Sequence, residues 1–188
     1  MVFKAPFMKK TGGSARKVVS HPDPRLSQVS KPVDLSSDAA LLQLQQLVDD
    51  LILTMRKENG AGLAAIQVGV AQRVFVYDIE GEEGEVGTPV GDTGAAALVN
   101  PKVILAGECV EDEEGCLSFP ALYAPVERSS GVVVEGFDHQ GNPVKVVAEG
   151  FLARVFQHEN DHLDGVSFVD RLSDDDKKHA LREYFDLL

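Results

Sequence analysis

The sequence predicts an α+β fold in which antiparallel β-sheets pack around a central helix that carries an H-E-x-x-H motif. Further helices are expected near the N-terminus and at the C-terminus. Two observations support this prediction. Residues 37–58 show the apolar spacing of an amphipathic helix, and two further helices are expected over 150–164 and from residue 174 to the end. The strand-like segments between them are joined by turns rather than by helical crossovers, which favours antiparallel pairing.

The first helix is expected over residues 37–58. Apolar side chains recur there three and four residues apart, which is typical of a helix with one buried face. These residues are Leu41, Leu44, Val48, Leu51 and Met55. Ser36 or Ser37 can cap the helix, and Asn59-Gly60 is a typical end.

The segments that follow alternate between strands and loops. Residues 73–79 predict one strand, and residues 97–105 predict another that Asn100-Pro101 interrupts. Residues 80–97 are rich in glycine and acid, so we expect an exposed loop there. Residues 132–137 and 144–147 predict a hairpin, followed by a second helix over 150–164 and a third from residue 174 to the end.

Length and composition narrow the class of protein. The chain has 188 residues, of which 44% are hydrophobic and 26% charged, as expected for one globular domain. Two cysteines are too few for a disulfide scaffold. A net charge of -12 argues against nucleic-acid binding, which needs basic residues. No apolar run reaches the roughly 18 residues that would predict a membrane span.

Basic residues are concentrated at the start of the chain. Residues 1–22 contain five basic residues and no acid, whereas the rest contains 13 basic and 30 acidic residues. We expect residues 1–17 to be a flexible or targeting segment and residues 18–188 to form the single domain.

The second helix contains His158-Glu159-Asn160-Asp161-His162, which is an H-E-x-x-H motif. Its two histidines are one helical turn apart, so both imidazoles leave the same face of the helix. That geometry suits two ligands of one metal ion, and the intervening glutamate can act as a general base on a metal-bound water. A metal site is therefore predicted here.

Residue spacing alone leaves the third ligand open. The metzincin pattern would require a histidine where Phe168 stands. A thermolysin-like site would instead use a downstream glutamate, for which Glu183 is a candidate. A cysteine from elsewhere in the chain, Cys116, is a further candidate.

Three motifs now stand in a characteristic order. They are Gly60-Ala61-Gly62-Leu63-Ala64-Ala65-Ile66-Gln67, Glu114-Gly115-Cys116-Leu117-Ser118 and Gln157-His158-Glu159-Asn160-Asp161-His162. Together they closely resemble the signature motifs of the peptide deformylases, over about residues 18–172. The resemblance implies a compact α+β catalytic domain that removes the N-formyl group from the initiator methionine of nascent polypeptides and releases formate.

The resemblance also implies the cofactor and its ligands. Cys116, His158 and His162 correspond to the metal ligands of the family. The expected cofactor is one divalent ion, Fe²⁺ in the cell, with Zn²⁺, Ni²⁺ or Co²⁺ as alternatives. The implied partners are N-formylmethionyl chains that emerge from the ribosome. We expect a monomer in a bacterial-type cytoplasm, although the basic start also fits an organelle.

By the same resemblance, Glu159 acts as the general base. The side-chain amide of Gln67 and the backbone N–H of Leu117 stabilise the oxyanion. We expect the peptide to add as a strand between residues 60–62 and 115–118. The expected substrate-binding residues are Gly60, Ala61, Gly62, Glu114, Gly115, Phe151, Arg154 and Val155.

Some features depart from the family pattern or lie outside it. Asp112 stands where many members carry an apolar residue, and the C-terminal segment is short and acidic. We expect Cys109 to be a spare buried thiol, and the isolated His21, His139 and His179 to be solvated. A thermolysin-like endoprotease and a non-catalytic metal-binding module are the alternative functions.

Overall fold

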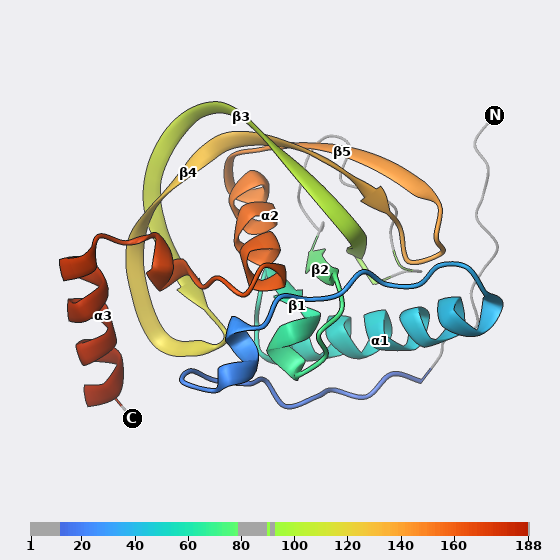
Figure 1. Ribbon diagram of the computed structural model, residues 1–188, viewed down its shortest axis with the longest axis horizontal. Coiled ribbons are helices and arrows are strands. Elements are labelled where there is room, and N and C mark those ends of the chain that lie inside the picture. Colours follow the sequence, from blue (N-terminus) through green and yellow to red (C-terminus); the bar gives the residue numbers. More distant parts are fainter. Residues whose placement is uncertain (1–11, 79–89, 91–92, 188) are drawn as a thin grey trace.

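The computed structural model describes residues 12–78, 90 and 93–187, and it has an α+β fold (Figure 1). The α-helices are α1 (Asp38–Lys57), α2 (Gly150–Leu163) and α3 (Asp174–Asp186). The strands are β1 (Gly62–Ala64), β2 (Val74–Asp78), β3 (Ala95–Cys116), β4 (Phe119–Phe137) and β5 (Pro143–Glu149). Three short 3-10 helices are η1 (Pro24–Ser27), η2 (Ala65–Val68) and η3 (Phe168–Arg171).

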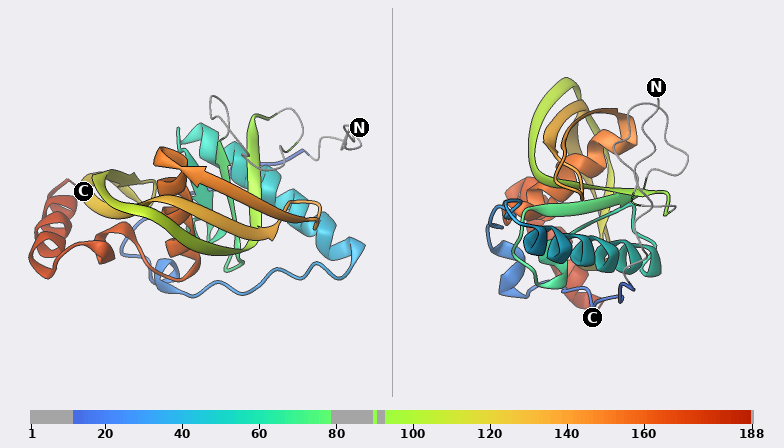
Figure 2. Two further views of the ribbon diagram at one scale, coloured as in Figure 1. Left: turned by 90° about the horizontal axis from the view of Figure 1, so that it is seen from above. Right: turned by 90° about the vertical axis from the view of Figure 1, so that its right-hand side faces the viewer.

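The five described strands form one antiparallel sheet in the order β1-β2-β3-β4-β5. The predicted α+β class with antiparallel pairing is therefore confirmed. Strands β3 and β4 are long and curve around α2 (Figure 1, Figure 2). Their pairing shifts register at three places, the last between Gly115 and Cys116. Such irregularities bend a strand pair and re-aim its side chains.

Strand β2 separates two parts of the hydrophobic core. Its side chains alternate in direction, so Val74 and Val76 pack in the cluster with α1, whereas Phe75 and Tyr77 pack in the cluster with α2. The ring of Tyr77 meets that of Phe156 on α2 edge-on, with centroids 4.6 Å apart. The sheet thus holds α2 by the apolar side of the helix that carries the H-E-x-x-H motif.

Each predicted helix is present within one or two residues of its expected ends. Helix α1 begins where Ser37 accepts a hydrogen bond from the Ala40 N–H at 3.2 Å. Near the start of the described chain, the Ser14 N–H and the Arg16 side chain both donate to Asp50 of α1. No helix in the described part of the chain is long and apolar enough to cross a membrane.

The β3–β4 ribbon is where the sequence-based expectation is wrong. The strand expected over 97–105 runs from Ala95 to Cys116, and β4 pairs with it from Phe119 onward. The end of the expected 80–97 loop therefore belongs to β3, while residues 79–89, 91 and 92 lie outside the described residues. The length of this strand was missed because β3 is exposed around the acidic residues Glu111, Asp112 and Glu113. The sequence there lacks the apolar alternation by which a half-buried strand is recognised.

Three isolated residues also differ from expectation. Cys109 is exposed rather than buried, because it lies in the part of β3, residues 104–113, that is exposed to solvent. His139 is buried rather than solvated, with 1% of its surface exposed, since the β4–β5 loop packs inward. His21 is half-buried and stacks on Phe119, whereas His179 is exposed as expected.

Candidate metal centre

Cys116, His158 and His162 lie together where the end of β3 meets α2. Their potential ligand atoms are all within 4.8 Å of one another, and no other group of this kind exists in the described ranges. His162 Nε2 lies 3.2 Å from Cys116 Sγ and 3.2 Å from His158 Nε2. One thiolate and two imidazoles converging on a point are a donor set that suits Zn²⁺, Fe²⁺ or similar ions.

Glu114 fixes the orientation of His158. Its Oε2 lies 2.9 Å from His158 Nδ1, so Nε2 is the ring nitrogen left for a metal. Arg128 and Arg154 both donate to the same carboxylate. Burial alone would raise the pKa of Glu114, but the hydrogen bonds from His158 and Arg128 lower it to about 2. The carboxylate is thus charged and held in one orientation.

Glu159 projects from α2 toward β1. Its side chain is buried against Gly62, and Oε2 has no hydrogen-bond partner in the part of the chain described. Burial raises the pKa of Glu159 to about 7, despite opposing effects of His158 and of the Ala64 backbone. A carboxylate with an unpaired oxygen and a pKa near neutrality has the properties of a general base.

Gln67, on η2, is held with its amide nitrogen toward the same centre. Its Oε1 accepts a hydrogen bond from the Ala64 N–H at 2.8 Å, and this contact assigns the oxygen and nitrogen positions of the side-chain amide. Its Nε2 then lies 3.2 Å from Ser118 Oγ and 3.5 Å from Cys116 Sγ. The turn after β1 therefore presents an N–H donor beside the candidate ligands.

The other expected site residues are brought to the same region with differing exposure. Gly60 lies against Leu117 and Gly62 lies against Glu159, so the segment 60–62 borders both the segment 115–118 and the motif helix. Arg154 and Val155 are buried on α2, while Phe151 is 62% exposed. The Arg154 guanidinium is committed to Glu114 and to the carbonyls of Val110 and Val126. Only its stem is available to line a pocket.

Glu183, the alternative third ligand, is exposed on α3 and does not belong to the ligand group. Sequence reasoning missed three buried polar side chains around the site. Ser118 contacts Gln67, Arg128 donates to Glu114, and Asp161 accepts from Arg128. Ser118 and Asp161 lie inside the recognised motifs, so their burial could have been suspected. Arg128 had no local signal, because it reaches the site only through the pairing of β3 with β4.

Comparisons with known proteins agree with this arrangement. The family model described as polypeptide deformylase matches residues 15–178. A peptide deformylase of Acidothermus cellulolyticus is 43% identical over 161 residues, covering 85% of this chain and 80% of the relative. One from Rhizobium meliloti is also 43% identical, over 164 residues, covering 87% and 88% of the two chains.

Solved structures show the same likeness. A peptide deformylase from Legionella pneumophila superposes with a TM-score of 0.79 at 37% identity, covering 93% of this chain and 95% of that one. A complex of the Ehrlichia chaffeensis peptide deformylase with actinonin gives 0.77 at 36% identity, covering 90% and 95%. On the motifs, the fold and these relatives, the chain belongs to the peptide deformylase family, whose enzymes remove the N-formyl group from nascent peptides.

Proposed function

We propose that this peptide deformylase acts through a divalent ion held by Cys116, His158 and His162, with α2 as the central helix of the site. The observation that carries the proposal is the convergence of these three ligand atoms beside the buried Glu159. Three protein ligands leave one coordination position for water or substrate, as in catalytic metal sites. When bound, the ion supplies Lewis acidity that lowers the pKa of water and polarises the formyl carbonyl.

Fe²⁺ is the proposed ion in the cell, and Zn²⁺, Ni²⁺ and Co²⁺ are the alternatives. A thiolate with two imidazoles favours these borderline ions over Mg²⁺ or Ca²⁺, which prefer oxygen ligands. A cation beside Glu159 would favour the charged form of that carboxylate and so lower the pKa that burial raises.

Glu159 is the proposed proton carrier. Its unpaired Oε2 accepts the proton from the attacking water and later delivers it to the amine that leaves. The formamide C–N bond breaks in that second step, which releases formate and the free methionine amine.

Gln67 and Leu117 are the proposed oxyanion donors. The Gln67 amide is pre-oriented by the Ala64 N–H, so no reorganisation is needed as negative charge develops on the formyl oxygen. The backbone N–H of Leu117 follows directly after Cys116 and supplies the second donor. Both donors favour the charged tetrahedral state over the neutral substrate.

The peptide is proposed to lie between residues 60–62 and 115–118, where main-chain hydrogen bonds ignore side-chain identity. The methionine side chain would enter beside Val155, the stem of Arg154 and Phe151, with Glu114 and Gly115 at the rim. We also propose that the enzyme is a cytoplasmic monomer that meets nascent chains at the ribosome.

Release of formate from a formyl-Met dipeptide tests this function. The protein should be loaded with Fe²⁺ under anaerobic conditions, and with Zn²⁺, Ni²⁺ and Co²⁺ in parallel. Formate release with at least one ion is expected, together with loss of bound metal in Cys116→Ser. Glu183→Gln is the matched control and should keep its metal. No formate with any ion, or metal loss only in Glu183→Gln, would contradict the proposal.

A further inference from the structure

Glu114, which orients His158, is the first member of a longer series of paired charges. Arg128 donates to Glu114 through Nε at 2.9 Å and Nη2 at 3.1 Å. The remaining nitrogen, Nη1, donates to Asp161 at 2.5 Å. Asp161 in turn accepts from Nε and Nη2 of Arg171 on η3, at 3.0 and 2.5 Å. Hydrogen bonds thus run without a break from His158 to Arg171.

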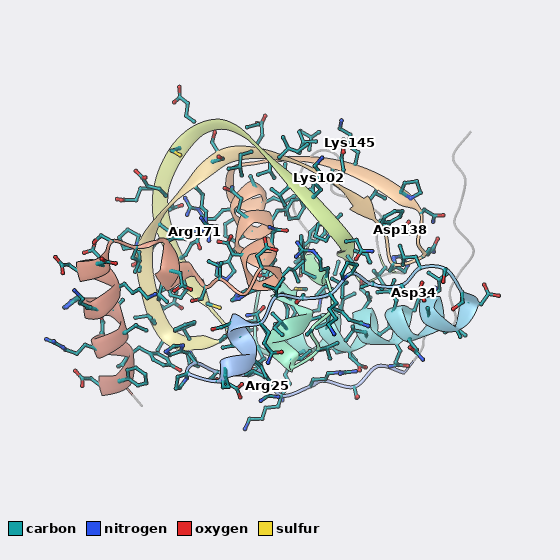
Figure 3. All side chains as sticks on the ribbon, in the orientation of Figure 1. Arg25, Asp34, Lys102, Asp138, Lys145 and Arg171 are labelled. Atoms are coloured by element: carbon teal, nitrogen blue, oxygen red, sulfur yellow. The ribbon has the colours of Figure 1, made fainter. Side chains whose placement is uncertain are left out.

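The inner members of this series are buried and the outer member is not. Glu114, Arg128 and Asp161 each expose only 5% of their surface, whereas the Arg171 side chain is 48% exposed. Figure 3 labels Arg171, which lines a surface groove together with residues of α2 and β4. A buried charge is tolerated only with defined partners, so each inner side chain has one favourable arrangement.

The planar guanidinium of Arg128 makes this arrangement directional. One edge of its fork meets Glu114 and the other end meets Asp161, so a rotation that breaks one contact breaks both. The hydrogen bond to Asp161 therefore keeps the Arg128 guanidinium in the orientation in which it binds Glu114. Arg171 binds the Asp161 carboxylate with two N–H donors, which fixes the plane of that carboxylate.

The series also closes a ring between the two elements that carry the ligands. His158 and Asp161 are one turn apart on α2, and Glu114 stands two residues before Cys116 on β3. Arg128 joins Glu114 to Asp161 from β4. The ring thereby sets the spacing between the strand that supplies the thiolate and the helix that supplies both imidazoles.

We propose that Asp161 and Arg171 are positioning residues for the metal site, acting on His158 and Cys116 through Arg128 and Glu114. This inference rests on the proposed ligand set. It assigns to Arg171, a half-exposed residue of η3 with no contact to the ligands, a role in metal affinity and ligand geometry.

Substitution at the two outer positions, combined with metal titration, tests the proposal. Asp161→Asn keeps the shape but removes the charge, and Arg171→Met keeps the stem but removes the donors. Loss of such outer partners typically weakens metal affinity roughly 10- to 100-fold. We expect that range for Asp161→Asn and about tenfold for Arg171→Met, because solvent partly replaces the latter. Arg171→Lys should recover part of the loss.

Arg73→Met is the matched control. Arg73 also pairs with an aspartate of the same helical end, donating to Asp164 at 2.6 Å, but it makes no contact with the ring. Its removal should leave metal binding unchanged while costing a similar amount of stability. A purely structural role for Arg171 would make the two arginine variants behave alike.

The readouts are Co²⁺ affinity by competition with a chelator and the visible absorption spectrum of the Co²⁺ protein, which reports ligand geometry. Weaker binding and a shifted spectrum in Arg171→Met but not in Arg73→Met support the proposal. Wild-type affinity and spectrum in Arg171→Met overturn it, even where Asp161→Asn fails to fold. Cys116→Ser distinguishes failure of the positioning role from failure of the proposed ligand set, because unchanged Co²⁺ binding in that variant refutes the ligand set itself.

Discussion

The carboxylate of Glu159 lies directly against the α-carbon of Gly62. A Cβ at position 62 would stand 2.6 Å from Glu159 Oε1 and 2.8 Å from its Cγ, closer than real Cβ contacts allow. Gly60 is confined in the same way by Leu117, since a Cβ there would stand 2.7 Å from Leu117 Cδ1. The glycines of the first motif thus make room for residues of the other two motifs.

Gly62→Ala should therefore impair turnover more than stability. The new methyl group meets the flexible end of Glu159, so the carboxylate moves while the backbone stays. A displacement of about 1 Å at a catalytic group can cost on the order of 100-fold in rate. We expect a fall of that size in kcat, measured as formate release, with metal content and melting temperature close to those of the parent protein.

Gly131→Ala is the control for this prediction. Gly131 also lies in a strand, but a Cβ there makes only ordinary contacts of 3.5 Å or more. Its kcat should stay within about twofold of the parent value. Equal losses in the two variants would mean that Glu159 is not the group displaced in Gly62→Ala.

Gln67→Leu removes a proposed oxyanion donor while keeping a side chain of similar size. Loss of one such donor typically costs about 100- to 1,000-fold in kcat, with little change in KM. The substitution also leaves the Ala64 N–H without its acceptor, so some loss of stability accompanies it. Steady-state kinetics on a formyl-Met dipeptide measure the effect. A rise in KM at unchanged kcat would assign Gln67 to substrate binding instead.

His139 should make stability depend on pH. Burial lowers its pKa below the ordinary value of 6.5, although the Asp138 carboxylate opposes the shift, and neither ring nitrogen has a partner in the described chain. Below about pH 6.5 the unfolded state binds the proton more readily, so the free energy of unfolding falls as the pH falls. Above that pH the residue is neutral in both states and the ionisation effect vanishes.

His139→Phe should remove this pH dependence and the cost of the unpaired nitrogens. We expect stabilisation of about 1 kcal/mol near pH 8 and more near pH 5.5, measured by thermal melts of metal-free protein. The candidate ligands are the same in both proteins, so their own titration cancels in the difference. If the gain is equal at both pH values, titration of His139 plays no part in stability.

All three helices could be predicted within one or two residues of their ends. Helix α1 buries one face with a 3.6-residue period, whereas α2 is buried on nearly every side and α3 buries only Ala180 and Tyr184. The full length of β3 could not be predicted, because its residues 104–113 are exposed and show no alternation to detect. The burial of His139 was equally hidden, since it follows from how the β4–β5 loop packs and not from its neighbours in sequence.

Within the site, the motif residues could be predicted from the sequence, but the side chains that hold them in position could not. Histidines at i and i+4 on a helix define two ligands locally. The convergence of Cys116 with those histidines depends on the pairing of β3 with β4, and so does the approach of Arg128. Strand register is a non-local property, which is why Arg128 carries no signal in the sequence alone.

Formate release by Glu159→Ala, measured together with its metal content, tests the central claim most directly. Removal of a general base should lower kcat by at least about 100-fold, while Cys116, His158 and His162 still bind one ion per chain. Near-wild-type turnover in the metal-loaded variant would contradict the assignment of Glu159. Loss of the ion would instead show that Glu159 is needed to build the metal site.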